Sequence, residues 1–146
     1  MRYVVSLIVA GCFLLAGNAA QNDLAKKDLD SLQGSWQYIS WVADGNPKSK
    51  EEIKGFKIII KGNKLTWIGF GKGIANAEAT IKLDPSKKPK AIDLTGPEME
   101  PSLGIYSIEG DTLKIYVKNS IGDTERPTEF KDGQNVSSFV LNREKR

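Results

Sequence analysis

Histidine is absent from this chain of 146 residues, and cysteine occurs once, at Cys12. Without imidazole the chain has no Ser-His-Asp or Cys-His site, no histidine general base and none of the common histidine-ligated zinc or iron sites. An excess of charge is missing too, because 21 Lys and Arg against 18 Asp and Glu leave a net charge of +3. Basic residues so well mixed with acidic ones do not indicate a nucleic-acid partner. We therefore expect no enzyme, no catalytic residue, no metal ion and no cofactor.

The chain also lacks a hydrophobic run of membrane-spanning length. Its apolar stretch, residues 3–16, has about 14 residues, whereas a spanning helix needs roughly 20. Arg2 precedes this stretch and small residues follow it, which is the layout of a secretory signal peptide. Cleavage after Ala19 gives a signal peptide over residues 1–19 and one domain over residues 20–146. We expect an exported protein, periplasmic or secreted, with no stable membrane span.

Two alternatives to this cleavage site stay open. Cleavage after Ala20 is the second choice. The segment Val9-Ala10-Gly11-Cys12 resembles a bacterial lipobox, which would give a lipoprotein anchored through Cys12. The apolar residues 13–15 that follow argue against lipidation, since a lipoprotein normally turns polar there. After cleavage at Ala19 the mature chain has no cysteine, so it forms neither a disulfide nor a thiolate metal site.

Alternating apolar and polar residues predict an all-β domain. Asp23–Leu32 has helical periodicity, and Ser49–Glu52 is a capping box that, with Gly55 as a stop, predicts one helical turn. Eight runs read as short strands: Gly34–Val42, Phe56–Lys61, Leu65–Trp67, Glu78–Leu83, Ile92–Leu94, Gly104–Glu109, Thr112–Lys118 and Ser137–Arg143. They favour an eight-stranded antiparallel up-and-down β-barrel with a short N-terminal helix, because closure removes exposed edges. A two-sheet sandwich is the alternative.

A short motif stands at the start of the first predicted strand. Gly34-Ser35-Trp36 follows the predicted helix directly and resembles the Gly-x-Trp signature of lipocalins. This resemblance implies that the tryptophan closes one end of a barrel and that an arginine of the last strand packs over its ring. By parity with Leu141, Arg143 lies on the inward face of the last strand. We therefore expect a cation–π contact between Trp36 and Arg143.

The resemblance to one bacterial family extends over the domain. It is carried by Leu32–Trp36, Asp44–Pro47, Leu83–Leu94, Gly104–Lys114 and Glu125–Phe130. These segments resemble the lipocalin-like domain family of planctomycetes, whose members have no assigned activity. Tyr116 departs from that pattern, because many relatives are expected to have a cysteine there. The resemblance implies the fold and leaves the function open.

The aromatic residues give the functional hypothesis. Parity places Trp36, Tyr38, Phe56, Trp67, Tyr106 and Phe139 inward, and Trp41 and Phe70 outward or at a rim. An eight-stranded barrel is filled by side chains or holds one small ligand. We expect a non-enzymatic exported protein that binds a small apolar ligand near Tyr38, Trp67 and Tyr106. The alternative is an envelope structural or interaction module with a filled barrel, which acts through an exposed Trp41 face shared with Ile39 or through the Arg126 loop.

The remaining motifs favour plain structural interpretations. Gly69–Gly73 lacks the Gly-Lys-Ser/Thr of a phosphate-binding loop and is interpreted as a strand connection. Glu98 and Glu100 lie in a loop between prolines, where solvated side chains are more common than a catalytic pair. For Glu125–Phe130, a rigid turn in which Arg126 pairs with an acid is favoured over a recognition loop.

Overall fold

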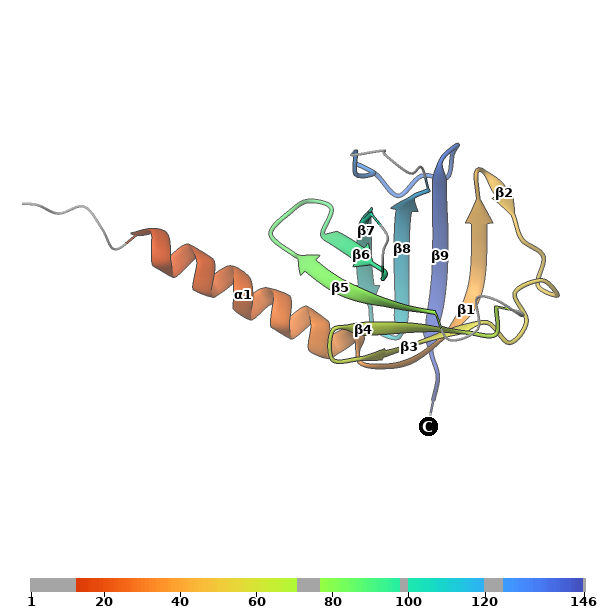
Figure 1. Ribbon diagram of the computed structural model, residues 1–146, viewed down its shortest axis with the longest axis horizontal. Coiled ribbons are helices and arrows are strands. Elements are labelled where there is room, and N and C mark those ends of the chain that lie inside the picture. Colours follow the sequence, from red (N-terminus) through yellow and green to blue (C-terminus); the bar gives the residue numbers. More distant parts are fainter. Residues whose placement is uncertain (1–12, 71–76, 98–99, 120–124, 146) are drawn as a thin grey trace, which may run out of the picture.

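The structure is a computed structural model that describes residues 13–70, 77–97, 100–119 and 125–145. A single helix of this part, α1 (Phe13–Leu32), precedes its strands (Figure 1). The strands are β1 (Gly34–Ala43), β2 (Asn46–Pro47), β3 (Lys57–Lys61), β4 (Lys64–Ile68), β5 (Glu78–Asp84), β6 (Ala91–Thr95), β7 (Ser102–Glu109), β8 (Thr112–Lys118) and β9 (Val136–Arg143). Each of the eight predicted strands corresponds to one of these, and the short β2 is additional.

The strands form a closed barrel. Neighbours in the order β1-β3-β4-β5-β6-β7-β8-β9 pair antiparallel, and β1 also pairs with β9. The two-residue strand β2 pairs antiparallel with the last residues of β1 and is not one of the eight strands that close the barrel. Closure gives the main strands a partner on each side, which removes the edges at which sheets aggregate. The up-and-down barrel is therefore confirmed, and the sandwich alternative is wrong.

A β-bulge in β1 changes which of its residues face inward. Tyr38 pairs with Leu141 and Ser40 with Val140, so that Ile39 is left over between them. One extra residue reverses the alternation of side chains beyond it. Trp41 consequently packs against the core, and Ile39 is 48% exposed. The predicted exposed Trp41 face is therefore wrong, because simple parity along β1 takes no account of the bulge.

Helix α1 begins ten residues before the predicted helix and ends at the same residue, Leu32. Leu29 and Leu32 pack into the core, whereas the N-terminal half of α1 extends away from the barrel (Figure 1). Within the described residues, no helix has the length and apolar character needed to cross a membrane. Cys12 and the rest of residues 1–12 lie outside the described part, so export remains a prediction.

The predicted capping box is present in the segment before β3, where it begins a series of turns. The Ser49 N–H donates to Glu52 Oε2 at 2.7 Å, and the Glu52 N–H donates to Ser49 Oγ at 3.2 Å. Residues 50–55 form turns in place of the predicted helical turn, and Gly55 ends them with φ +81°.

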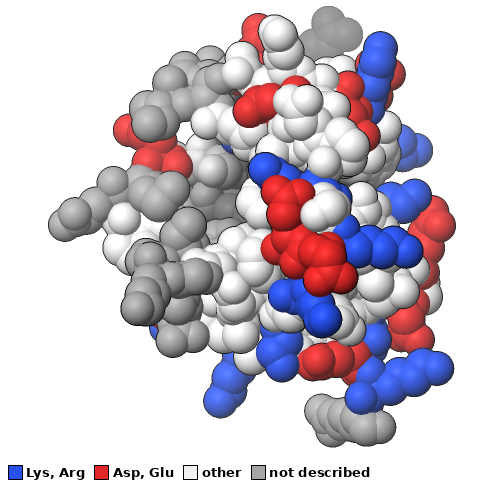
Figure 2. All heavy atoms as spheres, turned by 90° about the vertical axis from the view of Figure 1, so that its right-hand side faces the viewer, with Lys and Arg blue, Asp and Glu red and all other residues white. Residues whose placement is uncertain are grey.

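Figure 2 shows acidic and basic side chains intermixed over the side of the molecule that it views, without a large area of one sign.

Candidate functional site

The end of the barrel next to the helix is closed by Trp36 and Arg143. Trp36 is fully buried, and its Nε1–H donates to the Leu32 carbonyl at 2.8 Å. The Arg143 guanidinium carbon lies 4.2 Å from the centroid of the Trp36 ring, so the expected cation–π contact is present. Arg143 also donates to the carbonyls of Ser31 at 2.6 Å and Gln33 at 2.7 Å. These bonds satisfy carbonyls at the end of α1, which the helix itself leaves without partners.

Gly34 allows the chain to turn from the helix into β1. Its φ of +118° is one that side-chain-bearing residues rarely adopt, whereas a Cβ there would be 3.6 Å from Arg143 Nη1, an ordinary contact. Backbone conformation, and not lack of space, therefore favours glycine at this position. The three residues of the predicted signature, Gly34, Trp36 and Arg143, lie together at this closed end.

Tyr106 anchors the helix from inside the barrel. Its ring is buried, and its hydroxyl donates to Asp28 Oδ2 at 2.7 Å. Lys90 Nζ donates to the same oxygen at 2.8 Å. Burial, and then the bond to Asp28, raise the pKa of Tyr106. Partial burial opposes ionisation of Asp28, but the hydrogen bonds from Lys90 and Tyr106 outweigh it and lower the pKa of that carboxyl.

Replacement of Asp28 by asparagine should lower the free energy of unfolding by about 1–2 kcal/mol at pH 7, because the buried Tyr106 hydroxyl and the exposed Lys90 ammonium both lose a charged acceptor. The pKa of Asp28 is lowered from 3.8 on folding, so its contribution is present above pH 4 and is lost as the pH falls through the folded value. Urea unfolding of both proteins at pH 7 and pH 3 measures this difference, which should shrink at pH 3. The exposed Asp30, on the same helix, is the matched control: Asp30→Asn should change stability little. An equal loss at both pH values would contradict the role given to the Asp28 charge.

Tyr38 and Trp67, two of the three predicted ligand residues, line one cavity inside the barrel. Ile58, Leu65, Leu94, Ile115, Phe139 and Leu141 complete its lining. The cavity measures about 20 Å³, room for a single water molecule. Burial raises the pKa of Tyr38, against the effect of its hydrogen bond with Trp67, so the phenol stays neutral. Tyr106, the third predicted residue, is not part of this lining. It lies at the end of the barrel next to α1, where its hydroxyl reaches Asp28.

Five aromatic rings close the barrel above this cavity. We call Tyr38, Trp41, Phe56, Phe70 and Phe139 the aromatic stack. The centroids of the three phenylalanine rings lie 5.5–6.3 Å from the Tyr38 ring and 5.9–6.2 Å from the Trp41 ring. Each of the three phenylalanine rings therefore contacts both Tyr38 and Trp41. Since β1 starts at the helix end, Trp41 near its other terminus marks the opposite end of the barrel.

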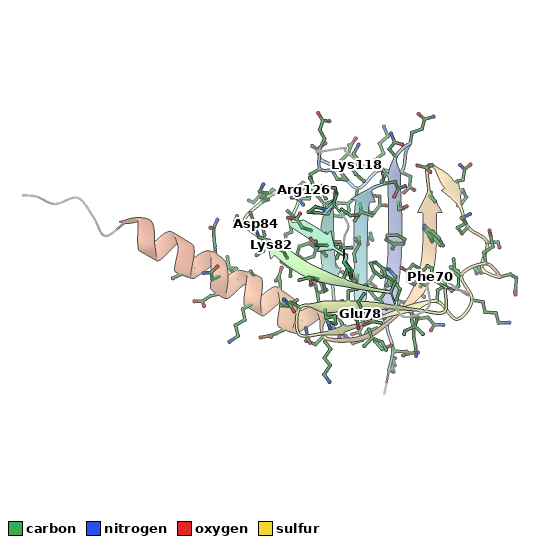
Figure 3. The ribbon with its side chains drawn as sticks, in the orientation of Figure 1. Phe70, Glu78, Lys82, Asp84, Lys118 and Arg126 are labelled. Carbon is green, nitrogen blue, oxygen red and sulfur yellow. The ribbon has the colours of Figure 1, made fainter. Side chains whose placement is uncertain are left out.

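Phe70 enters the aromatic stack from the connection after β4, on the side of the barrel away from α1 (Figure 3). Its ring stacks on Phe56 with centroids 4.2 Å apart. Gly69 makes this approach possible, because its φ is +95° and a Cβ there would lie 2.6 Å from the Gly55 carbonyl oxygen. The rest of the predicted glycine-rich connection, from Gly71 to Gly73, lies outside the described residues.

Trp41 is the one aromatic residue of the stack with an unused polar group. Its Nε1 atom is buried and has no hydrogen-bond partner in the described part of the chain. Leaving such a donor unsatisfied costs about 1–3 kcal/mol. The sequence predicted an outward Trp41, because the bulge at Ile39, which turns this side chain inward, has no signature in the sequence.

Arg126 holds a segment of chain against the outside of the barrel. It donates to the carbonyls of Ile92 at 3.1 Å and Gly104 at 2.8 Å, and the same nitrogen lies 2.7 Å from Asp93 Oδ1. The next residue, Pro127, is buried. The expected pairing of Arg126 with an acid is thus confirmed. Of the other predicted loop, Glu98 lies outside the described residues and Glu100 is exposed.

The comparisons with known proteins leave the family open. No protein-family model matches the chain, and no curated protein or solved structure is significantly similar to it. The geometry of the barrel therefore carries any assignment of function.

Proposed function

We propose that this chain is an exported, non-enzymatic binding protein that holds a small, largely apolar ligand at the aromatic end of its barrel. The observation that carries the proposal is the aromatic stack above a cavity lined by Tyr38 and Trp67. Rings of this kind offer a ligand large apolar contact area and preferred edge-to-face geometries. The lipocalin-like resemblance of Gly34, Trp36 and Arg143 supports the same conclusion.

The ligand takes the place of the Phe70 ring. Phe139 lies within β9 and Phe56 directly precedes β3, whereas Phe70 follows β4 on a connection. Rotation of Phe70 out of the stack breaks no pairing between strands. The space it leaves lies against Tyr38 and above the existing cavity, where apolar surface is available to a ligand of similar size.

A second candidate function is an interaction module with a filled barrel. The cavity of about 20 Å³ favours it, because this volume holds no organic molecule as it stands. In this case the aromatic stack is simply core, and a ligand has no means of entry. The two functions differ in whether removal of the Phe70 ring creates a site that fills.

Titration with ethylbenzene, followed by calorimetry and tryptophan fluorescence, tests the proposal on the wild-type protein and on Phe70→Ala. We expect saturable binding by both. The variant should bind about tenfold more tightly or better, since no buried ring has to be displaced and that burial is worth about 1.5–3 kcal/mol. Phe130→Ala is the matched control, because Phe130 contacts Tyr116 outside the barrel and is 40% exposed. Absence of saturable binding in a folded Phe70→Ala protein would overturn the proposal in favour of the interaction module.

A further inference from the structure

Within the described residues, the Trp41 indole contacts three rings and one cation, and its buried N–H has no hydrogen-bond partner. Its ring neighbours are Phe56, Phe70 and Phe139, none of which has an oxygen to accept a hydrogen bond. Lys48 Nζ lies 5.7 Å from the centroid of the Trp41 ring and is a donor as well. Buried donors without partners are rare in proteins, and each asks for an explanation.

The backbone holds Trp41 in this position. Trp41 pairs with Phe139 across the β1–β9 ladder, and its carbonyl accepts from the Lys48 N–H at 2.8 Å. The bulge at Ile39 then sets the side of the sheet from which the indole projects. The N–H of an outward indole would donate to water. Because of the bulge, this donor instead lies among phenylalanine rings, which have no acceptor atom.

From this geometry we infer that the ligand of the aromatic end carries one uncharged carbonyl oxygen, which accepts a hydrogen bond from Trp41 Nε1. This inference rests on the proposed binding function. The carbonyl is uncharged because the surrounding layer consists of phenylalanine rings, where an ion is poorly solvated. Lys48 supplies no free counter-charge, since its Nζ lies 3.7 Å from Glu52 Oε1. The remainder of the ligand is apolar and replaces Phe70 against Tyr38.

Two ligands of nearly the same shape test the inference. Acetophenone has a carbonyl oxygen where α-methylstyrene has a methylene group, so the pair isolates the acceptor. The variant Trp41→Phe keeps an aromatic ring and removes the N–H. We expect the ratio of the affinity for acetophenone to that for α-methylstyrene to be about fivefold higher in the wild-type protein than in Trp41→Phe.

A second readout follows the N–H itself. The chain has three tryptophans, so the ¹H–¹⁵N spectrum contains three indole signals, and the one missing in Trp41→Phe identifies Trp41. Acetophenone should move that signal downfield, and α-methylstyrene should not. If both ligands bind and neither the ratio nor the signal distinguishes them, the carbonyl inference is overturned and the binding function stands. If neither ligand binds to the wild-type protein, the binding function itself fails.

Discussion

Replacing Trp36 with alanine should lower the free energy of unfolding by about 3–5 kcal/mol, the largest loss expected of any single core residue here. Trp36 has no exposed surface, and its removal leaves a cavity next to Leu32. It also removes the surface on which Arg143 stacks and the donor for the last turn of α1. Urea unfolding followed by far-ultraviolet circular dichroism measures the loss without depending on the fluorescence of the deleted residue.

Two further variants separate the contributions at this end of the barrel. Trp36→Phe keeps a ring beneath Arg143 and lacks the N–H that donates to Leu32, so its loss should be smaller than that of the alanine variant. Gln37→Ala, on the exposed face of the same strand, should change stability little. A loss below about 1 kcal/mol for Trp36→Ala would contradict the view that this residue closes the barrel.

The second large effect is expected at Gly104. A Cβ at this position would lie 2.6 Å from both the Tyr116 carbonyl oxygen and Val117 Cγ1. The carbonyl belongs to β8, which pairs with β7 at this level, so it has no room to withdraw. Gly104→Ala should therefore cost about 3 kcal/mol, the upper end of the usual range for overpacking. The midpoint of urea unfolding, or the melting temperature, reports the change.

Gly133 provides the matched control for this substitution. A Cβ there has no atom within 4 Å and the residue has no unusual φ angle, so Gly133→Ala should be neutral or slightly stabilising. The same methyl group is added in both variants. Equal effects at Gly104 and Gly133 would show that the close approach of β7 and β8 is easily relieved, and the prediction would be wrong.

Strand positions could be predicted from the sequence because alternation is a local property. Leu113, Ile115 and Val117 are buried and mark β8 without any knowledge of its neighbours. The same alternation placed Arg143 correctly over Trp36, since β9 is regular beyond Leu141. At Ile39 the alternation fails, because a bulge depends on how β1 fits β9 and not on its own residues.

Depth within the barrel could not be predicted at all. Parity places Tyr38 and Tyr106 correctly on the inward face, yet one lines the cavity and the other reaches Asp28 on the helix. The level along the barrel axis at which an inward side chain lies depends on strand tilt and register. These are set by pairings between strands far apart in sequence. For the same reason, the volume of the cavity became known only from the packed side chains.

The barrel closes only when β1 pairs with β9, so folding cannot finish before β9 is present. Arg143 donates to the carbonyl of Ser31 across a separation of 112 residues, and the two strands that close the barrel are the first and the last long ones of the described chain. A growing chain that lacks β9 leaves β1 and β8 with open edges. Closure therefore comes last, and contacts this distant in sequence make folding slow. Until β9 pairs, the unpaired N–H and C=O groups of β1 and β8 can bind strands of other chains. We therefore expect chaperones to matter most at the stage just before β9 pairs.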